Sequence, residues 1–152
     1  MKKSERMQTF VKTLGIEGGK DFDARYVGFF DCFNRKLYYE AHDVLEDLWL
    51  EKRDENHAYY KGLIQVAGSY VHLQKQYYRP HHHKDGRRLY PTVRLLRIAV
   101  ENLSPYGSRH LRLDVAALCK KCAALADQIE KSGFETNPWR PERAPTLTLT
   151  DL

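Results

Sequence analysis

The chain has 152 residues, 42% of them hydrophobic and 30% charged, with a formal net charge of +5. This composition fits one ordered globular domain and excludes a disordered chain. No apolar run approaches the roughly 18 residues needed to span a bilayer, and the start of the chain lacks the apolar core of a signal peptide. We therefore expect a cytoplasmic protein with no membrane partner.

The first half of the chain predicts three helices after an N-terminal extension, residues 1–20. The first predicted helix, 23–34, places four aromatic side chains on one face. The second covers 37–52, and a short polar link separates it from the third, 57–78. The third is apolar around most of its circumference, so we expect it at the centre of the core. The aromatic residues of the first helix are Tyr26, Phe29, Phe30 and Phe33.

Two further helices are predicted in the second half. Pro91 suits the first turn of a helix, so the fourth is expected to begin there and to run to Leu103. The fifth is expected over 110–132, where Gly133 closes it.

The last segment, 134–152, contains three prolines and no helical period, so it predicts an extended tail docked through Trp139. Short links between amphipathic helices favour antiparallel neighbours. The predicted fold class is therefore all-α: an up-and-down bundle of about five helices over residues 21–133, followed by the extended tail.

Cys119 and Cys122 form a C-x-x-C pattern, which alone is a weak signal for zinc or redox chemistry. Both lie on the apolar stripe of the predicted fifth helix, and the sequence has no second cysteine pair to complete a zinc site. The pattern therefore favours two core residues over a metal or redox motif.

The positive charge is concentrated in residues 77–97, where six basic residues face one acidic residue, Asp85. Interleaved tyrosines make phosphate or nucleic-acid binding one interpretation, because Arg and Lys hold phosphates and bases stack on aromatic rings. A solvated basic loop is the alternative, and the sequence favours it. The basic residues are Arg79, Lys84, Arg87, Arg88, Arg94 and Arg97.

The predicted second helix carries charge where core residues are expected. His42 projects within the apolar arc beside Trp49, and Glu46 lies at the edge of that arc, one turn from His42. A buried carboxylate is costly unless it is paired, protonated or bound to a cation. We therefore expect Glu46 to have a partner, and His42 is the nearest in sequence.

A narrow polar stripe without full-time charges runs along the predicted third helix. If the second and third helices pack antiparallel, His42 and Glu46 lie level with residues 62–65, and Asn34 lies near Ser69 and His72. The hypothesis is a shared polar pocket between the helices. Its expected members are Asn34, His42, Glu46, Trp49, Gln65, Ser69 and His72.

Three interpretations of this pocket remain open. His42, Glu46 and His72 are suitable ligands for zinc, manganese or iron and would leave a coordination position for water. A metal-free His–Glu pair can instead act as a general base with its orienting carboxylate. The polar residues can also simply satisfy one another and fix how the helices dock.

The stretches FNRKLYYEAHDVLEDLW and YYKGLIQVAGSYVH resemble a bacterial and archaeal family catalogued as domain of unknown function 309. Its hallmark is H-x-x-x-E-x-x-W followed by G-L-I-Q, here His42, Glu46 and Trp49 and then residues 62–65. The resemblance covers about residues 29–125 and implies an all-helical bundle without an established activity. The chain lacks the proline that often precedes G-L-I-Q, and its basic stretch 76–90 is longer than usual.

Two functional hypotheses follow. The first is a helical-bundle protein whose inter-helix pocket binds a small ligand or a divalent metal, with hydrolytic chemistry as one outcome. The second is a non-enzymatic interaction module, expected as a homo-oligomer, whose basic segment binds an acidic partner or RNA.

Overall fold

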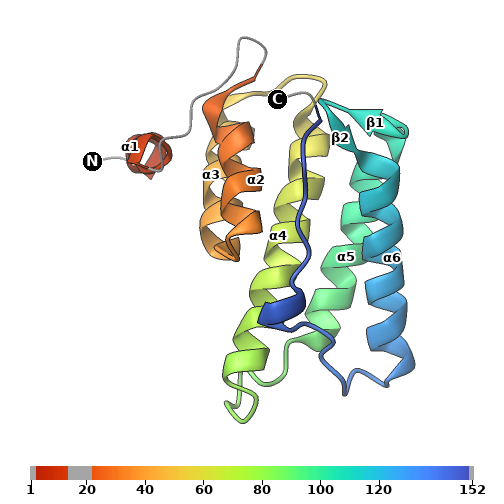
Figure 1. Cartoon of the computed structure of the whole chain (residues 1–152). Coiled ribbons are helices and arrows are strands. Elements are labelled where there is room, and N and C mark those ends of the chain that lie inside the picture. Colours follow the sequence, from red (N-terminus) through yellow and green to blue (C-terminus); the bar gives the residue numbers. More distant parts are fainter. Residues whose placement is uncertain (1–2, 14–21, 151–152) are drawn as a thin grey trace.

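The computed structural model describes residues 3–13 and 22–150, which form six helices, two 3₁₀ turns and one small hairpin (Figure 1). The predicted all-α class is confirmed. None of the helices in these residues has the length and apolar character that crossing a membrane requires. The helices are α1 (Lys3–Thr13), α2 (Ala24–Asn34), α3 (Tyr38–Glu51), α4 (His57–Tyr78), α5 (Leu89–Leu103) and α6 (Val115–Lys131).

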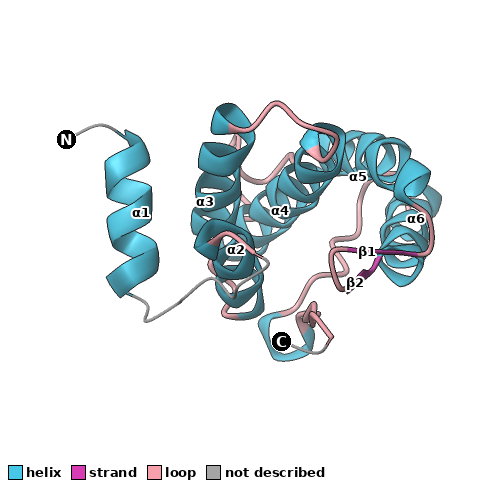
Figure 2. Ribbon diagram, turned by 90° about the horizontal axis from the view of Figure 1, so that it is seen from above, coloured by secondary structure: helices cyan, strands magenta, loops and turns pink. Residues whose placement is uncertain are grey.

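Helix α4 lies at the centre, with α2 and α3 on one side and α5 and α6 on the other (Figure 2). Helix α1 lies beyond α3, at the edge of the bundle. The predicted third helix matches α4 at both ends. Its central place follows from its sequence, because Ile64 and Val66 point to opposite sides of the helix and are both buried.

Aromatic rings fill the α2 side of the core. Phe29 and Phe33 of α2 are fully buried, and Phe33 meets Tyr38 and Tyr70 edge to face, each at 5.1 Å between ring centroids. Edge-to-face pairs of this kind contribute about 0.5–1.5 kcal/mol beyond the burial of their area. The aromatic stripe predicted in the first helix is therefore its core face.

Close approach of two helices explains the glycine of the G-L-I-Q motif. A methyl group on Gly62 of α4 would lie 2.7 Å from Cγ of Leu103 and 3.3 Å from the backbone oxygen of Ala99, both on α5. Because Leu103 is fully buried, it has little room to move away. Gly62 thus sets the contact distance between α4 and α5 at this level.

The structure corrects three predicted boundaries. Residues 110–114 are not helical: strands β1 (Arg109–His110) and β2 (Leu113–Asp114) form a hairpin, and α6 begins after Asp114, whose carboxylate caps the N–H of Ala117. The turn places Leu111 and Arg112 at positive φ without glycine or asparagine to signal it. Helix α5 begins at Leu89, two residues before Pro91. Helix α1 lies within the segment predicted only as an extension.

The tail runs extended along the bundle from the end of α6 to the hairpin end of the molecule (Figure 1), with one 3₁₀ turn at Pro141–Arg143. Trp139 is buried, and its Nε1 donates a hydrogen bond to the hydroxyl of Tyr38 at 3.2 Å. Further along, the amide of Asn34 both donates to the backbone oxygen of Leu147 and accepts from its N–H. The domain division at 20/21 and 133/134 stays a prediction, and the first of these boundaries lies outside the described residues.

Candidate metal centre on helix α3

Three side chains on one turn of α3 bring their ligand atoms together. One atom each from His42, Asp43 and Glu46 lie within 4.8 Å of one another. Nδ1 of His42 is 3.1 Å from Oδ1 of Asp43, and Nε2 of His42 is 3.9 Å from Oε2 of Glu46. The His–Glu spacing of four residues stacks the two side chains on one face of the helix. All three are half-buried, so they remain within reach of solvent.

A cation from another helix already approaches this group. Nζ of Lys3, on α1, lies 3.1 Å from Oε1 of Glu46 and 3.8 Å from Oδ1 of Asp43. The hydrogen bond to Glu46 raises the pKa of Lys3 above its usual 10.5. The two carboxylates are therefore arranged so that one positive charge satisfies both.

Helices α3 and α4 are antiparallel neighbours, and two contacts fix their register. A Cβ on Gly68 would lie 3.9 Å from Cδ2 of His42, and Nζ of Lys61 lies 4.4 Å from the ring centroid of Trp49. Trp49 is seven residues after His42, and Lys61 is seven residues before Gly68. Glu46 therefore lies near the level of Gln65, whereas His42 lies about one turn beyond the predicted level of residues 62–65.

Three of the predicted pocket residues are engaged elsewhere. Ser69 is fully buried and donates to the backbone oxygen of Val66 in its own helix at 2.6 Å. Gln65 accepts a hydrogen bond from Asn102 of α5 at 2.7 Å, and Asn34 holds the tail. The structure thus brings His42 and Glu46 together but does not gather all seven predicted residues around them.

His72 does not belong to the ligand group within 4.8 Å. Its Nδ1 accepts a hydrogen bond from the guanidinium of Arg88 at 2.9 Å. Burial first, and then the charge of Arg88, lower the pKa of His72 to about 4, so the imidazole is neutral at pH 7. The third residue of the ligand group is therefore Asp43, whereas the sequence analysis had suggested His72. A helical projection points Asp43 away from the apolar arc, but the His42 ring reaches back to it.

The basic segment is partly neutralised within the fold. Asp85 is buried and pairs with both Arg79 and Arg88, which lower the pKa of its carboxyl, Arg88 most strongly. Arg97 pairs with Asp127 and Glu130 of α6. The six residues therefore do not form one continuous free patch. No ion pair of Lys84, Arg87 or Arg94 is found among the described residues.

The cysteine pattern belongs to the core. Cys122 is buried and Cys119 half-buried on α6. Burial raises the pKa of both thiols, to about 12 for Cys122, so neither is a thiolate at neutral pH.

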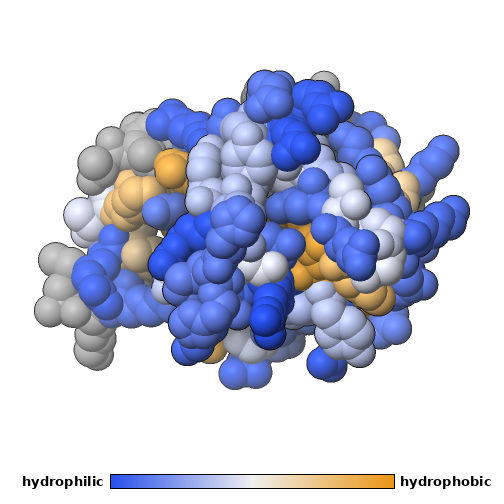
Figure 3. Space-filling view, turned by 90° about the horizontal axis from the view of Figure 1, so that it is seen from below, coloured by the Kyte–Doolittle hydropathy of each residue, from blue (hydrophilic) through white to orange (hydrophobic). Residues whose placement is uncertain are grey.

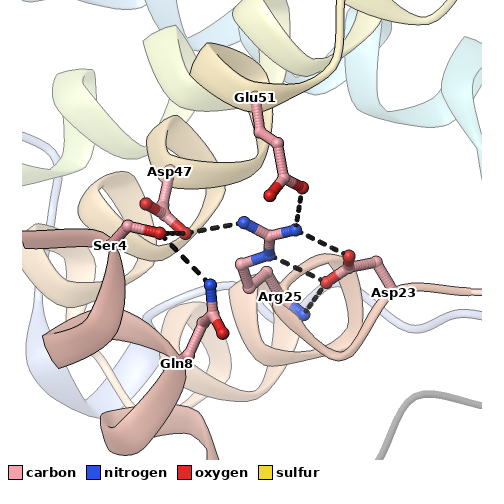
Figure 4. Close-up of polar contacts among 6 residues, drawn as sticks. All are labelled: Ser4, Gln8, Asp23, Arg25, Asp47 and Glu51. Atoms are coloured by element: carbon pink, nitrogen blue, oxygen red, sulfur yellow. Dashed lines mark hydrogen bonds and ion pairs between the residues drawn. The ribbon is translucent and has the colours of Figure 1, made fainter.

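Sequence reasoning missed an ion cluster on the adjacent face of α3, one turn after Asp43 (Figure 4). Arg25 of α2 is buried and pairs with Asp47 at 2.7 Å, Glu51 at 2.6 Å and Asp23 at 2.8 Å. These contacts hold the pKa of Arg25 above its usual value, with Asp23 as the first cause. Helix α1 joins the cluster because Ser4 donates to Asp47 at 3.3 Å. The available sequence signal was Asp23 as an N-cap, followed by a lone arginine beside an aromatic face.

Comparison with known proteins finds a resemblance to a family without an assigned activity. Residues 26–83, which span α2, α3 and α4, match the model of a family described as Domain of unknown function (DUF309). The resemblance indicated by the H-x-x-x-E-x-x-W and G-L-I-Q motifs is therefore confirmed. No curated protein and no solved structure matches the chain significantly.

Proposed function

We propose that the protein binds a divalent metal ion through His42, Asp43 and Glu46. One observation carries the proposal: an imidazole and two carboxylates lie within 4.8 Å of one another, half-buried, and already attract the ammonium group of Lys3. One nitrogen and two oxygen ligands suit zinc, manganese or iron. Small adjustments of three side chains on a single helical turn bring such atoms to coordination distance.

Three protein ligands leave coordination positions for water, which is the arrangement of catalytic rather than structural zinc sites. A bound ion of this kind lowers the pKa of its water, and hydrolysis is the chemistry that it supplies. Lys3 has to leave first. The Lys3–Glu46 pair is 46% and 26% exposed, and exposed pairs contribute only about 0–1 kcal/mol, so its displacement costs little.

Calorimetric titration of the full chain, stripped of metal with a chelator, tests the proposal with zinc and with manganese. We expect one ion per chain, and at least a tenfold loss of affinity in each of His42→Ala, Asp43→Asn and Glu46→Gln. Glu40→Gln is the matched control, because it removes a carboxylate of the same helix outside the ligand group. The absence of binding to the wild-type chain, or equal binding by all variants, contradicts the proposal.

As a second candidate we propose an interaction surface for an acidic partner or RNA near the start of α5. A cleft of about 350 Å³ between α5 and α6 is lined by Arg94, Arg97, Phe134 and Tyr90, whose side chain is 61% exposed. Seen from the end of the bundle where α4 ends, the surface is largely hydrophilic (Figure 3). Arg94, which forms no ion pair within the described residues, lies beside the exposed ring of Tyr90, and such a combination suits phosphates and bases.

Retention on a heparin column separates the two candidates. We expect the double variant Arg87→Ala, Arg94→Ala to elute at lower salt than the wild type, and Arg79→Gln, whose charge is already paired with Asp85, to change elution less. Equal elution of all three proteins counts against the interaction surface. Sedimentation equilibrium of the same samples tests the expected homo-oligomer.

A further inference from the structure

Trp49, the last residue of the H-x-x-x-E-x-x-W motif, has an unusual polar atom. Its Nε1 is buried without a hydrogen-bond partner. The other buried side-chain atom in the described residues without a hydrogen bond, Oδ2 of Asp31, lies 3.0 Å from Nε of Arg35 in an ion pair. Trp49 Nε1 is thus the exception among these residues. Buried indole N–H groups normally donate to an acceptor, so this donor calls for one.

Two positively charged side chains lie close to the indole. Nζ of Lys61 lies 4.4 Å from the ring centroid and the guanidinium carbon of Arg53 lies 5.8 Å from it, while the ring of His57 stacks on it at 4.8 Å. Neither Lys61 nor Arg53 forms an ion pair with a carboxylate within residues 3–13 and 22–150. A donor without a partner, in a ring flanked by two cations without a carboxylate partner, is suited to one kind of ligand, an oxyanion.

The register of α3 and α4 places this group near the candidate metal centre. Trp49 follows Glu46 by three residues, a rise of about 4.5 Å along the helix, and it shares a face with His42, seven residues earlier. One small molecule can therefore span the two positions.

We propose that Trp49 Nε1, Lys61 and Arg53 bind an oxyanion, so that the ligand of the α3 centre is a carboxylate or a phosphate ester. The second half of this statement rests on the proposed metal function; the first half does not. The Lys61 and Arg53 side chains lie over the indole, and both are long and flexible. As an oxyanion enters, they swing with it, and the charges that cover the ring neutralise the ligand while the indole N–H donates to it.

Nuclear magnetic resonance of the ¹⁵N-labelled chain can observe the indole N–H directly. The chain has two tryptophans, and Nε1 of Trp139 already donates to Tyr38, so its resonance is an internal control. We expect inorganic phosphate, titrated in the presence of chelator, to shift the Trp49 resonance to a plateau and to leave that of Trp139 in place. Chloride at matched ionic strength should move neither, and an acetate series distinguishes carboxylate from phosphate.

Variants connect the shift to the site. Lys61→Gln should weaken the phosphate response of Trp49 about tenfold, Arg53→Gln should weaken it less, and Lys75→Gln, an exposed lysine near the end of α4, should leave it unchanged. A Trp49 resonance that ignores both anions, or follows chloride equally, overturns the inference. The response should persist in His42→Ala. If the Trp49 resonance responds to phosphate while the wild type binds no metal, the proposed metal function fails and the anion site stands. If the wild type binds metal while the Trp49 resonance does not respond to anions, the anion site fails and the proposed metal function stands.

Discussion

Two regions of helix α3 meet cations in different ways. In the last two turns of α3, Arg25 binds Asp47 and Glu51 at 2.6–2.7 Å, and the side chains of Arg25 and Asp47 are both 7% exposed. One turn earlier, on the adjacent face, Lys3 meets Glu46 and Asp43 at 3.1–3.8 Å, and its own side chain is 46% exposed. The buried cluster joins α2 to α3, whereas the exposed one closes over ligand atoms that solvent can reach. We infer that the first is structural and the second exchangeable.

Removal of the buried cation should have the largest effect. Arg25→Ala leaves Asp47 buried without its charged partner, and breaking a buried ion pair in this way costs about 3–5 kcal/mol. Urea unfolding followed by circular dichroism measures the loss. Arg97→Ala is the control, because its pairs with Asp127 and Glu130 are exposed and their loss should cost less than about 1 kcal/mol. Similar stabilities of the two variants would mean that the buried cluster is not structural.

A substitution in α4 tests a region held by packing rather than by charge. Gly62→Ala gains helix propensity but forces its methyl group against Leu103 and the backbone of Ala99. Overpacking of this kind costs about 1–3 kcal/mol. Gly68→Ala is the matched control on the same helix, since its methyl group would lie 3.4 Å or more from its neighbours. A Gly62→Ala chain as stable as Gly68→Ala in the same assay would show that Gly62 does not set the α4–α5 distance.

Low pH should destabilise the cluster of Arg25, and high pH should destabilise the cluster of Lys3. The hydrogen bonds from Arg25 hold the pKa of Asp23 below 3.8, so the stability that Asp23 contributes is present above 3.8 and is lost as the pH falls through its lowered value. The pKa of Lys3 is raised above 10.5, so its contribution is present below 10.5 and is lost as the pH rises through its raised value.

Denaturant unfolding at a series of pH values measures these two losses. Asp23→Asn should flatten the acid limb, and Lys3→Met should flatten the alkaline limb. Unchanged limbs in the variants would assign the pH dependence to other groups.

The features of α3 and α4 that could be predicted from the sequence depend on residues close together in the chain. His42 and Glu46 meet because they are four residues apart on one helix, and the bounds of α4 follow from its apolar pattern and polar start. The cations could not be predicted in the same way. Lys3 lies 43 residues from Glu46, and Arg25 lies 22 residues from Asp47, so only the folded chain brings them together.

Two errors have a related cause. The helical projection represents each side chain as a point on a circle, and it points Asp43 away from the apolar arc that contains His42, although the imidazole is long enough to reach Asp43. The hairpin before α6 was missed because Leu111 and Arg112 adopt positive φ without the residues that usually mark such a turn. Two long-range hydrogen bonds hold that turn: Tyr26 of α2 donates to the backbone oxygen of Leu111, and the N–H of Thr150 in the tail donates to that of Arg112. Neither contact can be inferred from a local sequence pattern.

Removal of the exposed cation should have the smallest effect on stability and a useful effect on binding. Lys3→Ala should change the free energy of unfolding by less than about 1 kcal/mol, because its pair with Glu46 is exposed. If a metal ion competes with Lys3 for Glu46 and Asp43, the same substitution should tighten metal binding, by up to about fivefold for about 1 kcal/mol of lost competition. Calorimetry on wild type and variant gives both affinities, and Arg6→Ala, an exposed cation of the same helix, controls for net charge. If Arg6→Ala increases the metal affinity as much as Lys3→Ala does, the effect comes from long-range charge and not from competition at the site. If Lys3→Ala binds metal more weakly than the wild type, Lys3 supports the site instead of competing for it.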